Sequence, residues 1–156
     1  MFLSDSLFKQ VMAFTPLVSI DLVVRDSRGR VLLGKRKNRP ARNTWFVPGG
    51  RILKNECLDD AFWRLTQQEL GLPTKRKDAR LLDVYEHFYA DSVFGDEVDT
   101  HYVVLGYLID WPDIDVQDCP QEQHEAYHWF TLEEAQASPE VHSHTKNYFT
   151  TLTRLR

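Results

Sequence analysis

The sequence lacks a long uninterrupted hydrophobic run. No apolar stretch approaches the roughly 18 residues that a membrane-spanning helix needs, and segment 1–14 has no basic start followed by a long uncharged core. Repeats, low-complexity tracts and linkers are also missing. These absences predict one soluble domain over residues 1–156 that is cytoplasmic and does not bind a membrane.

Cysteine is scarce, with Cys57 and Cys119 alone in the sequence. Their spacing is not that of a zinc site, and they are too few for the disulfide framework of a secreted domain. We expect two thiols that are buried or half-buried. With 156 residues and 42% hydrophobic content, the chain is long enough for one ordinary hydrophobic core.

Charge is unevenly distributed along the chain. The formal net charge of -4 argues against general nucleic-acid binding. Residues 35–51 nevertheless contain six basic side chains and no acidic one, whereas residues 110–145 contain nine acidic side chains and no Lys or Arg. A basic loop on an acidic protein predicts a small anionic ligand rather than a polyanion.

Hydrophobic periodicity predicts helices and strands in an order typical of an α+β domain. Apolar residues at helical spacing predict a leading helix up to residue 14, capped by Ser4 or Asp5, and two helical stretches near the carboxyl terminus. Alternation predicts strands at 17–24, 31–36, 45–47, 80–89, 101–109 and 126–130. Strands dominate the front and middle of the chain, which indicates a mixed sheet covered by helices.

Residues 49–72 combine a glycine loop with a helix predicted over 56–70. Gly49 and Gly50 let the backbone approach a ligand closely, because glycine has no Cβ. We expect Asn55 to cap the helix and Gly71 to end it. An apolar stripe should face the sheet; it consists of Leu58, Ala61, Phe62 and Leu65.

Glu69 projects from this helix together with Leu65 and Gln68, which lie four and one positions before it. On helix geometry alone, Glu69 is a solvated residue near a helix end. Its spacing relative to the glycine loop gives it a second interpretation. That interpretation comes from a resemblance to a known family.

The segment resembles the signature of the Nudix hydrolases, which act on nucleoside diphosphates linked to another group. The matching positions are Gly50, Glu56, Arg64, Glu69 and Gly71. The usual signature places Glu at the positions of Leu65 and Gln68, and an aliphatic residue at Thr66. The resemblance implies a Nudix-type α/β/α sandwich with a mixed sheet, in which Arg64 pairs with a carboxylate and orients the helix.

The two missing carboxylates change what a metal can do here. Three clustered carboxylates hold two or three divalent cations and bring activated water to phosphorus, whereas one carboxylate cannot. Glu69 can still bind one Mg²⁺ or Mn²⁺ per active site, together with a backbone carbonyl near Gly49, waters and phosphate oxygens. Such an ion would neutralise a departing diphosphate, so we expect the chemistry to lie away from phosphorus.

Within the superfamily, the altered helix resembles that of the GDP-mannose mannosyl hydrolase family. The resemblance extends to "TPLVSIDLVV", "LLGKRKNRPARNTWFVPGGR", "EHFYAD", "THYVVLGY" and "QEQHEAY". It implies hydrolysis of GDP-mannose, with GDP-glucose also open, to GDP and the free sugar. In that family water attacks the anomeric carbon with inversion, one divalent metal serves each site, and the protein is a homodimer.

The resemblance assigns three catalytic residues besides the metal helix. His124, in an acidic loop, matches the catalytic base, and an imidazole with an ordinary pKa of about 6.5 suits that role. We expect Glu122 and Glu125 to raise this pKa. His87 helps the leaving group or orients the base, and Asp21 steadies positive charge on the sugar carbon. Without the resemblance, His124 is a solvated loop residue and His87 a packed strand histidine.

The same resemblance selects residues for substrate binding. Arg36 and Arg51 contact the diphosphate, with Arg36 also counted as catalytic, because a planar guanidinium binds phosphate oxygens in pairs. Tyr102 donates a hydrogen bond to phosphate. Guanine stacks on an aromatic ring, either Phe2 or Tyr89, and the sequence does not choose between them.

Two other functions remain open at this stage. An ordinary Nudix diphosphatase would cleave a nucleotide sugar at phosphorus, giving GMP and mannose 1-phosphate. A non-catalytic nucleotide-sugar sensor could reuse the fold for binding. The presence of both Glu69 and His124 argues against a sensor, because binding alone needs neither residue.

Overall fold

The computed structural model describes residues 2–111 and 115–155. Seven strands form one sheet in this part of the chain. They are β1 (Leu17–Arg25), β2 (Val31–Arg36), β3 (Trp45–Phe46), β4 (Gly49–Arg51), β5 (Arg80–Tyr89), β6 (Thr100–Asp110) and β7 (His124–Phe130). The main path runs β3-β2-β1-β6-β5, while β4 pairs with β1 and β7 pairs with β2.

The pairing directions make the sheet mixed, as the sequence predicts. β1 lies parallel to β6, and its other pairs, with β2 and β4, are antiparallel. β5 is antiparallel to β6, and β7 is antiparallel to β2. The pairing of β1 with β4 sets Asp21 opposite Gly49, which brings a strand carboxylate to the glycine loop.

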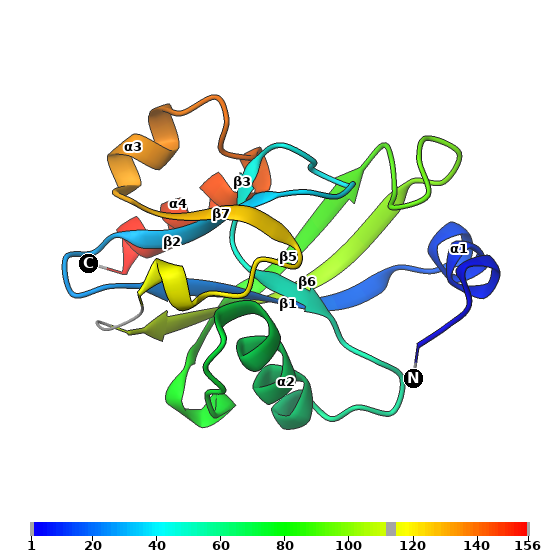
Figure 1. Cartoon of the computed structure of the whole chain (residues 1–156), viewed down its shortest axis with the longest axis horizontal. Helices are drawn as coiled ribbons and strands as arrows, with labels where there is room; N and C mark the ends of the chain where they lie inside the picture. The colour runs from blue at the N-terminus through cyan, green and yellow to red at the C-terminus, as the bar shows by residue number, and fades with distance from the viewer. Residues whose placement is uncertain (1, 112–114, 156) are drawn as a thin grey trace.

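Helices cover both faces of the sheet (Figure 1). One face packs against α2 (Leu58–Leu70), and the other packs against α3 (Leu132–Ala137) and α4 (Ser143–Arg154). Alternation along β1 supplies both cores, since Ile20 and Leu22 contact the α2 side and Val23 contacts the α4 side. The predicted α/β/α sandwich is therefore confirmed.

The remaining helical segments are short or peripheral. The leading helix α1 (Asp5–Phe14) begins after Ser4, whose side chain accepts a hydrogen bond from the Leu7 amide, so the predicted cap is confirmed. Two short 3₁₀ helices, η1 (Arg76–Asp78) and η2 (Val116–Asp118), lie in connections. None of the helices in residues 2–111 and 115–155 has the length and apolar character needed to cross a membrane.

The start of α2 differs from the prediction. The helix begins at Leu58, its N-cap residue is Cys57, and Asn55 lies outside it in a left-handed conformation with φ of 64°. The reason is local: the Glu56 carboxylate accepts the Leu53 amide at 2.9 Å, which stabilises a turn where the helix was expected to start. Gly71 ends the helix in the left-handed region, as predicted.

Two burial predictions for this segment need correction. The apolar stripe of α2 is buried at Ala61, Phe62 and Leu65, but Leu58, one turn before Phe62, is 37% exposed. Cys119 is buried as expected, whereas Cys57 is exposed because it precedes the first turn of the helix. The buried part of α2 is therefore its middle and carboxyl-terminal half.

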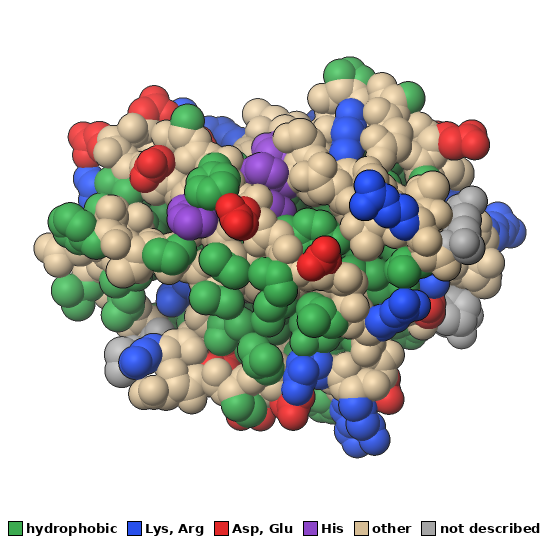
Figure 2. All heavy atoms as spheres, turned by 180° about the vertical axis from the view of Figure 1, so that it is seen from behind, with side chains coloured by type: hydrophobic (Ala, Val, Ile, Leu, Met, Phe, Trp, Pro, Cys, Tyr) green, Lys and Arg blue, Asp and Glu red, His purple; other side chains and the backbone are tan. Residues whose placement is uncertain are grey.

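One face of the molecule gathers many hydrophobic side chains, as Figure 2 shows from behind. β5 lies at the edge of the main strand path and exposes Leu81, Val84 and Phe88, the last with 59% of its surface accessible. Exposed apolar side chains on an edge strand are a feature that monomeric proteins usually limit.

Candidate active site

A pocket of about 360 Å³ opens beside the glycine loop. It brings together most of the residues that the sequence assigns to the substrate. Its lining includes Asp21, Arg36, Gly49, Arg51, Tyr89 and Tyr102. Phe2 also lies on the pocket and is 81% exposed, so its ring is available at the rim.

Two guanidinium groups give this pocket a basic lining. Arg36, at the end of β2, donates from Nε to the Pro40 carbonyl at 2.9 Å, which fixes its side chain. Arg51, at the end of β4, lies over the Phe8 ring with 4.7 Å from Cζ to the ring centroid. Both arginines line the pocket from the ends of their strands, and Gly49 and Gly50 line it as well. Without a Cβ, these glycines leave their backbone accessible in the pocket.

Asp21 is a buried carboxylate held from α4. The Tyr148 hydroxyl donates to Asp21 Oδ2 at 2.6 Å. A Cβ on Gly49 would lie 2.5 Å from Oδ1, so only glycine fits at that position. Burial raises the pKa of Asp21 to about 7, although Tyr148 and Arg36 both oppose the rise.

His87 lies on β5, close to Asp21. Its Nδ1 is 4.0 Å from Asp21 Oδ2, and its ring stacks on His144 with 4.3 Å between centroids. Burial, with His144 and His142 nearby, lowers the pKa of His87 to about 3. The imidazole is therefore neutral at neutral pH. Its Nε2 has no hydrogen-bond partner among the residues that the structure describes.

Glu69 is not solvated, which corrects the interpretation from helix geometry alone. It is 3% exposed, because the carboxyl-terminal half of α2 packs against the sheet. Burial raises the pKa of Glu69 to about 7; Arg36 opposes this shift and Asp21 adds to it. Oε2 has no hydrogen-bond partner within the described chain.

His124 is the first residue of β7 rather than a loop residue, and it is 1% exposed. It pairs with Arg36 on β2, and its Nδ1 lies 3.8 Å from Glu69 Oε2. The expected rise of its pKa is wrong: burial, then Arg36 and Lys37, lower it to about 4. The acidic neighbours in the sequence do not decide the shift, because desolvation is the largest contribution.

Gly34 makes room for the His124 ring. A Cβ at position 34 would lie 2.6 Å from both Cγ and Cδ2 of His124, which is closer than real Cβ atoms come. β2 and β7 can therefore pair with the imidazole placed over the backbone of Gly34. This contact could not be predicted from sequence, because it depends on the register between β2 and β7.

Leu65 and Gln68, at the two positions where carboxylates are missing, have different environments. Leu65 is 2% exposed, and a Cβ on Gly50 would lie 2.6 Å from its Cδ2. Gln68 is exposed and accepts from Arg64 Nη1 at 3.2 Å. Glu69 is consequently the only buried carboxylate on α2.

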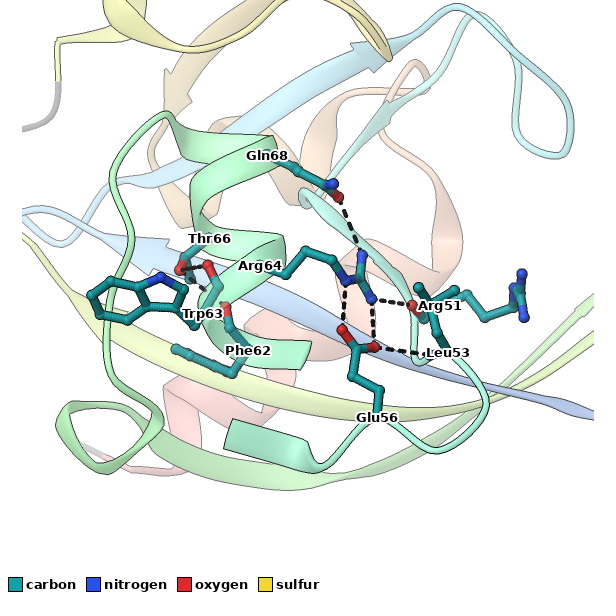
Figure 3. Close-up of polar contacts among 8 residues, drawn as sticks. All are labelled: Arg51, Leu53, Glu56, Phe62, Trp63, Arg64, Thr66 and Gln68. Carbon is teal, nitrogen blue, oxygen red and sulfur yellow. Dashed lines mark hydrogen bonds and ion pairs between the residues drawn. The ribbon is translucent and has the colours of Figure 1, made fainter. Parts of the chain in front are cut away.

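Glu56 and Arg64 form a closed polar cluster at the other end of the segment (Figure 3). Arg64 donates from Nε to Glu56 Oε1 at 2.6 Å and from Nη2 to Oε2 at 2.8 Å. Nη2 also donates to the Arg51 carbonyl at 2.9 Å. Arg64 thus pairs with a carboxylate, as the sequence predicts, and joins α2 to the glycine loop.

A family model described as the NUDIX domain matches residues 15–152. The chain belongs to the Nudix family. Among curated relatives, the low-salt glycan biosynthesis protein Agl8 of Haloferax volcanii is 41% identical over 109 residues, which are 70% of this chain and 68% of that protein. An ADP-ribose pyrophosphatase of Methanocaldococcus jannaschii is 36% identical over 70 residues, which are 45% of this chain and 40% of that protein.

Solved structures agree with the family assignment. The MutT NUDIX hydrolase of Burkholderia pseudomallei superposes with a TM-score of 0.69 and 27% identity, over 88% of this chain and 98% of that one. The NUDIX domain of Shewanella oneidensis NrtR, solved with ADP ribose, superposes with a TM-score of 0.68 and 17% identity, over 99% of this chain and 100% of that one. The second likeness concerns the fold alone.

Nudix hydrolases generally use a divalent metal such as Mg²⁺. Residues 2–111 and 115–155 contain no group of three or more His, Cys, Asp or Glu side chains that could hold a metal. Glu69 still fits a one-carboxylate site, because its Oε2 is buried without a partner. A cation beside that oxygen would offset the cost of burying its charge.

Two site residues were missed by sequence reasoning. Tyr127 contacts the His124 ring, and Tyr148 contacts Asp21. Tyr127 stands in the same short segment as His124, so the segment itself was the available signal. Tyr148 lies 127 positions after Asp21 and had no such signal, since only the packing of α4 on β1 brings them together.

Proposed function

We propose that this Nudix protein hydrolyses GDP-mannose, with GDP-glucose as a second candidate substrate, to GDP and the free sugar. Water attacks the anomeric carbon, and the configuration inverts. The observation that carries this proposal is the single buried carboxylate of α2: Leu65 packs on Gly50 where a carboxylate would stand, and Glu69 alone lies beside His124.

The pocket binds the nucleotide part through its basic and aromatic lining. Arg36 and Arg51 contact the diphosphate, and Tyr102 donates to a phosphate oxygen. The guanine ring stacks on Phe2 or Tyr89, both of which line the pocket. Binding by these groups leaves the sugar near Asp21, on the glycine-loop side of the pocket.

Glu69 and the Gly49 carbonyl would hold one Mg²⁺ or Mn²⁺ per site. When bound, such an ion supplies positive charge that stabilises GDP as a leaving group. Oxygen ligands of this kind suit both cations. The raised pKa of Glu69, to about 7, supports a role in which a cation compensates the carboxylate charge.

His124 accepts the proton from the attacking water. With its pKa lowered to about 4, the imidazole is unprotonated at neutral pH and ready to act as a base. The water oxygen bonds to C1, the bond from C1 to the phosphate oxygen breaks, and GDP leaves with that electron pair. Asp21 steadies positive charge on C1, and neutral His87 orients the groups around it.

A diphosphatase that cleaves at phosphorus is the competing proposal, and the relative described as an ADP-ribose pyrophosphatase supports it. Attack at phosphorus normally relies on clustered carboxylates, and the environments of Leu65 and Gln68 argue against it here. A non-catalytic sensor is disfavoured because a buried base lies beside a buried carboxylate. The glycan biosynthesis relative favours a sugar-linked substrate.

The bond that breaks can be identified in H₂¹⁸O with GDP-mannose and Mg²⁺. We expect the label on C1 of mannose and none on GDP, and the first sugar from the α-linked substrate should be the β anomer. Mass spectrometry of both products and rapid NMR of the sugar provide these readouts. Label on a phosphate group would contradict the proposal, and GMP with mannose 1-phosphate would establish the diphosphatase.

We propose that residues 1–156 act as one Nudix domain in the cytoplasm. We further propose a homodimer, supported by the apolar side chains that edge strand β5 exposes. Its partner molecules are then a nucleotide sugar and a second copy of the chain, without nucleic acid or membrane.

A further inference from the structure

The Tyr127 hydroxyl lies at the centre of three polar contacts. It is 3.1 Å from His124 Nδ1, 2.8 Å from the Pro120 carbonyl and 3.1 Å from the Glu69 carbonyl. The three partners come from β7, from the segment before it, and from the carboxyl-terminal end of α2. No sequence expectation or family assignment gives this tyrosine a role.

The positions of the hydrogens follow from counting donors. A phenol has one proton, and both carbonyl oxygens can only accept hydrogen bonds. If that proton goes to the Pro120 carbonyl, at the shorter distance, the hydroxyl can accept a hydrogen bond from a protonated Nδ1 of His124, and two of the three contacts are hydrogen bonds. If it goes to a bare Nδ1 instead, both carbonyl oxygens face the lone pairs of the hydroxyl. The arrangement that satisfies more contacts therefore has the proton on Nδ1.

Glu69 favours the same arrangement. Its Oε2 is 3.8 Å from His124 Nδ1, and a carboxylate attracts an N–H and repels a nitrogen lone pair. The His124 ring occupies the space beside Gly34 on β2, since a Cβ at that position would lie 2.6 Å from its Cγ and Cδ2.

We propose that Tyr127 is a positioning residue that fixes the tautomer of His124, with the proton on Nδ1 and the lone pair on Nε2. This inference rests on the proposed function only in giving Nε2 the role of base. Nε2 is buried and has no hydrogen-bond partner in residues 2–111 and 115–155. It is therefore the nitrogen that is free to accept a proton from water.

The same hydroxyl couples the base to the metal helix. The Tyr127 oxygen lies 3.1 Å from both His124 Nδ1 and the Glu69 carbonyl, so one atom contacts the base and the end of α2. Loss of the hydroxyl removes the acceptor for Nδ1–H and lets the proton move to Nε2. In that tautomer Nε2 is a donor, and the ring cannot take a proton from the attacking water.

The tautomer is measurable without substrate or metal. Proteins labelled with ¹⁵N-histidine give ring nitrogen and carbon-bound proton correlations that distinguish protonated from bare nitrogens, and the His124→Gln variant assigns the His124 signals. We expect a protonated Nδ1 and a bare Nε2 in the parent protein at pH 7. A parent spectrum with the proton on Nε2 would overturn the inference, whatever the activity of the enzyme.

Tyr127→Phe should transfer proton population to Nε2. The matched control is Tyr85→Phe, which removes a half-buried hydroxyl whose partner is Thr151 at 2.8 Å. The control should leave the His124 signals unchanged. An unchanged tautomer in a folded Tyr127→Phe protein would also overturn the inference.

Kinetics add a second, independent readout. Tyr127→Phe should lower kcat on GDP-mannose by about 10- to 100-fold, with KM nearly unchanged, because part of the general-base contribution is lost. In a His124→Gln background, Tyr127→Phe should lower kcat very little further, because the base that it positions is already absent. A parent protein that does not cleave GDP-mannose would defeat the proposed function, while the NMR result would still decide the tautomer.

Discussion

Glu56 and Glu69 are the same residue type near the two ends of one segment, yet their surroundings are opposite. Both oxygens of Glu56 are hydrogen-bonded, to Arg64 and to the Leu53 amide, and these bonds keep its pKa below the ordinary value. Glu69 is buried, its Oε2 has no hydrogen-bond partner in residues 2–111 and 115–155, and burial raises its pKa to about 7. One carboxylate is thus fully hydrogen-bonded within the protein, and the other keeps an oxygen that is not.

This difference teaches how to separate a structural from a functional acid. A carboxylate whose bonds are complete stabilises the fold and has no capacity left for chemistry. A buried carboxylate with an open oxygen costs stability, and it is retained where a cation or substrate uses it. A substitution at Glu69 should therefore mainly lower activity, and a substitution at Glu56 should mainly lower stability.

The largest expected effect is the loss of turnover in Glu69→Gln. Removal of the only buried α2 carboxylate should lower kcat on GDP-mannose by about 10³-fold, because several kcal/mol of leaving-group stabilisation is lost. Asp60→Asn, on the same helix but exposed, is the matched control. Activity of Glu69→Gln close to that of the control at ordinary Mg²⁺ would eliminate the one-carboxylate mechanism.

Glu56→Gln should instead weaken the fold. We expect a loss of about 2 to 4 kcal/mol in the free energy of unfolding at pH 7, since Arg64 is left without its charged partner. The folded-state pKa of Glu56 is lowered, so its stabilisation is present above the ordinary value of 4.5. That stabilisation is lost as the pH falls through the folded pKa. Denaturant titrations at pH 7 and pH 3 should show the difference between variant and parent shrinking at acid pH.

Glu69→Gln should have the opposite, smaller effect on stability. Because the folded-state pKa of Glu69 is raised to about 7, ionising this buried carboxyl destabilises the parent. The destabilisation is absent below pH 4.5, grows between pH 4.5 and about 7, and is complete above that. In EDTA at pH 8 the variant should therefore be more stable than the parent, by at most about 3 kcal/mol. If variant and parent differ in free energy of unfolding by the same amount at pH 8 and at pH 4, then ionisation of Glu69 does not destabilise the fold.

The smallest expected effect is that of Gln68→Glu. The side chain is exposed and already contacts Arg64, so a new ion pair there should change the free energy of unfolding by less than about 1 kcal/mol. Attack should not move to phosphorus, because Leu65 still fills the other position. The site of ¹⁸O incorporation measures this directly, and label on GDP or GMP from this single variant would contradict our account of the altered helix.

Periodicity and turn residues predicted most of the elements and the mixed sheet, whereas the α/β/α sandwich was implied by the family resemblance. Alternation in β1 and the glycine at the end of α2 predicted elements that the structure contains, because both depend on local chemistry. The start of α2 was misplaced at Asn55, since the deciding interaction joins Glu56 to Leu53 and Arg64 rather than capping the helix. Helix caps are local signals, but a competing side-chain network overrides them.

The candidate site was less accessible to sequence reasoning. Spacing within residues 49–72 drew attention to Glu69, but its burial depends on how α2 packs. The charged neighbours of His124 predicted a shift of its pKa in the wrong direction, because desolvation is set by β2 and β7. Tyr148 was missed for the same reason: its contact with Asp21 exists only in the folded chain.

The parallel pairing of β1 with β6 has a consequence for the chain as it is synthesised. Leu17 pairs with Tyr102, so β1 can pair with β6 only after a much later part of the chain has been synthesised. At 5 to 20 residues per second, roughly 3 to 11 seconds separate the addition of Glu69 from that of His124. The nascent chain thus carries its glycine loop and α2 well before β7, and the proposed site is complete only after residue 124 has been added.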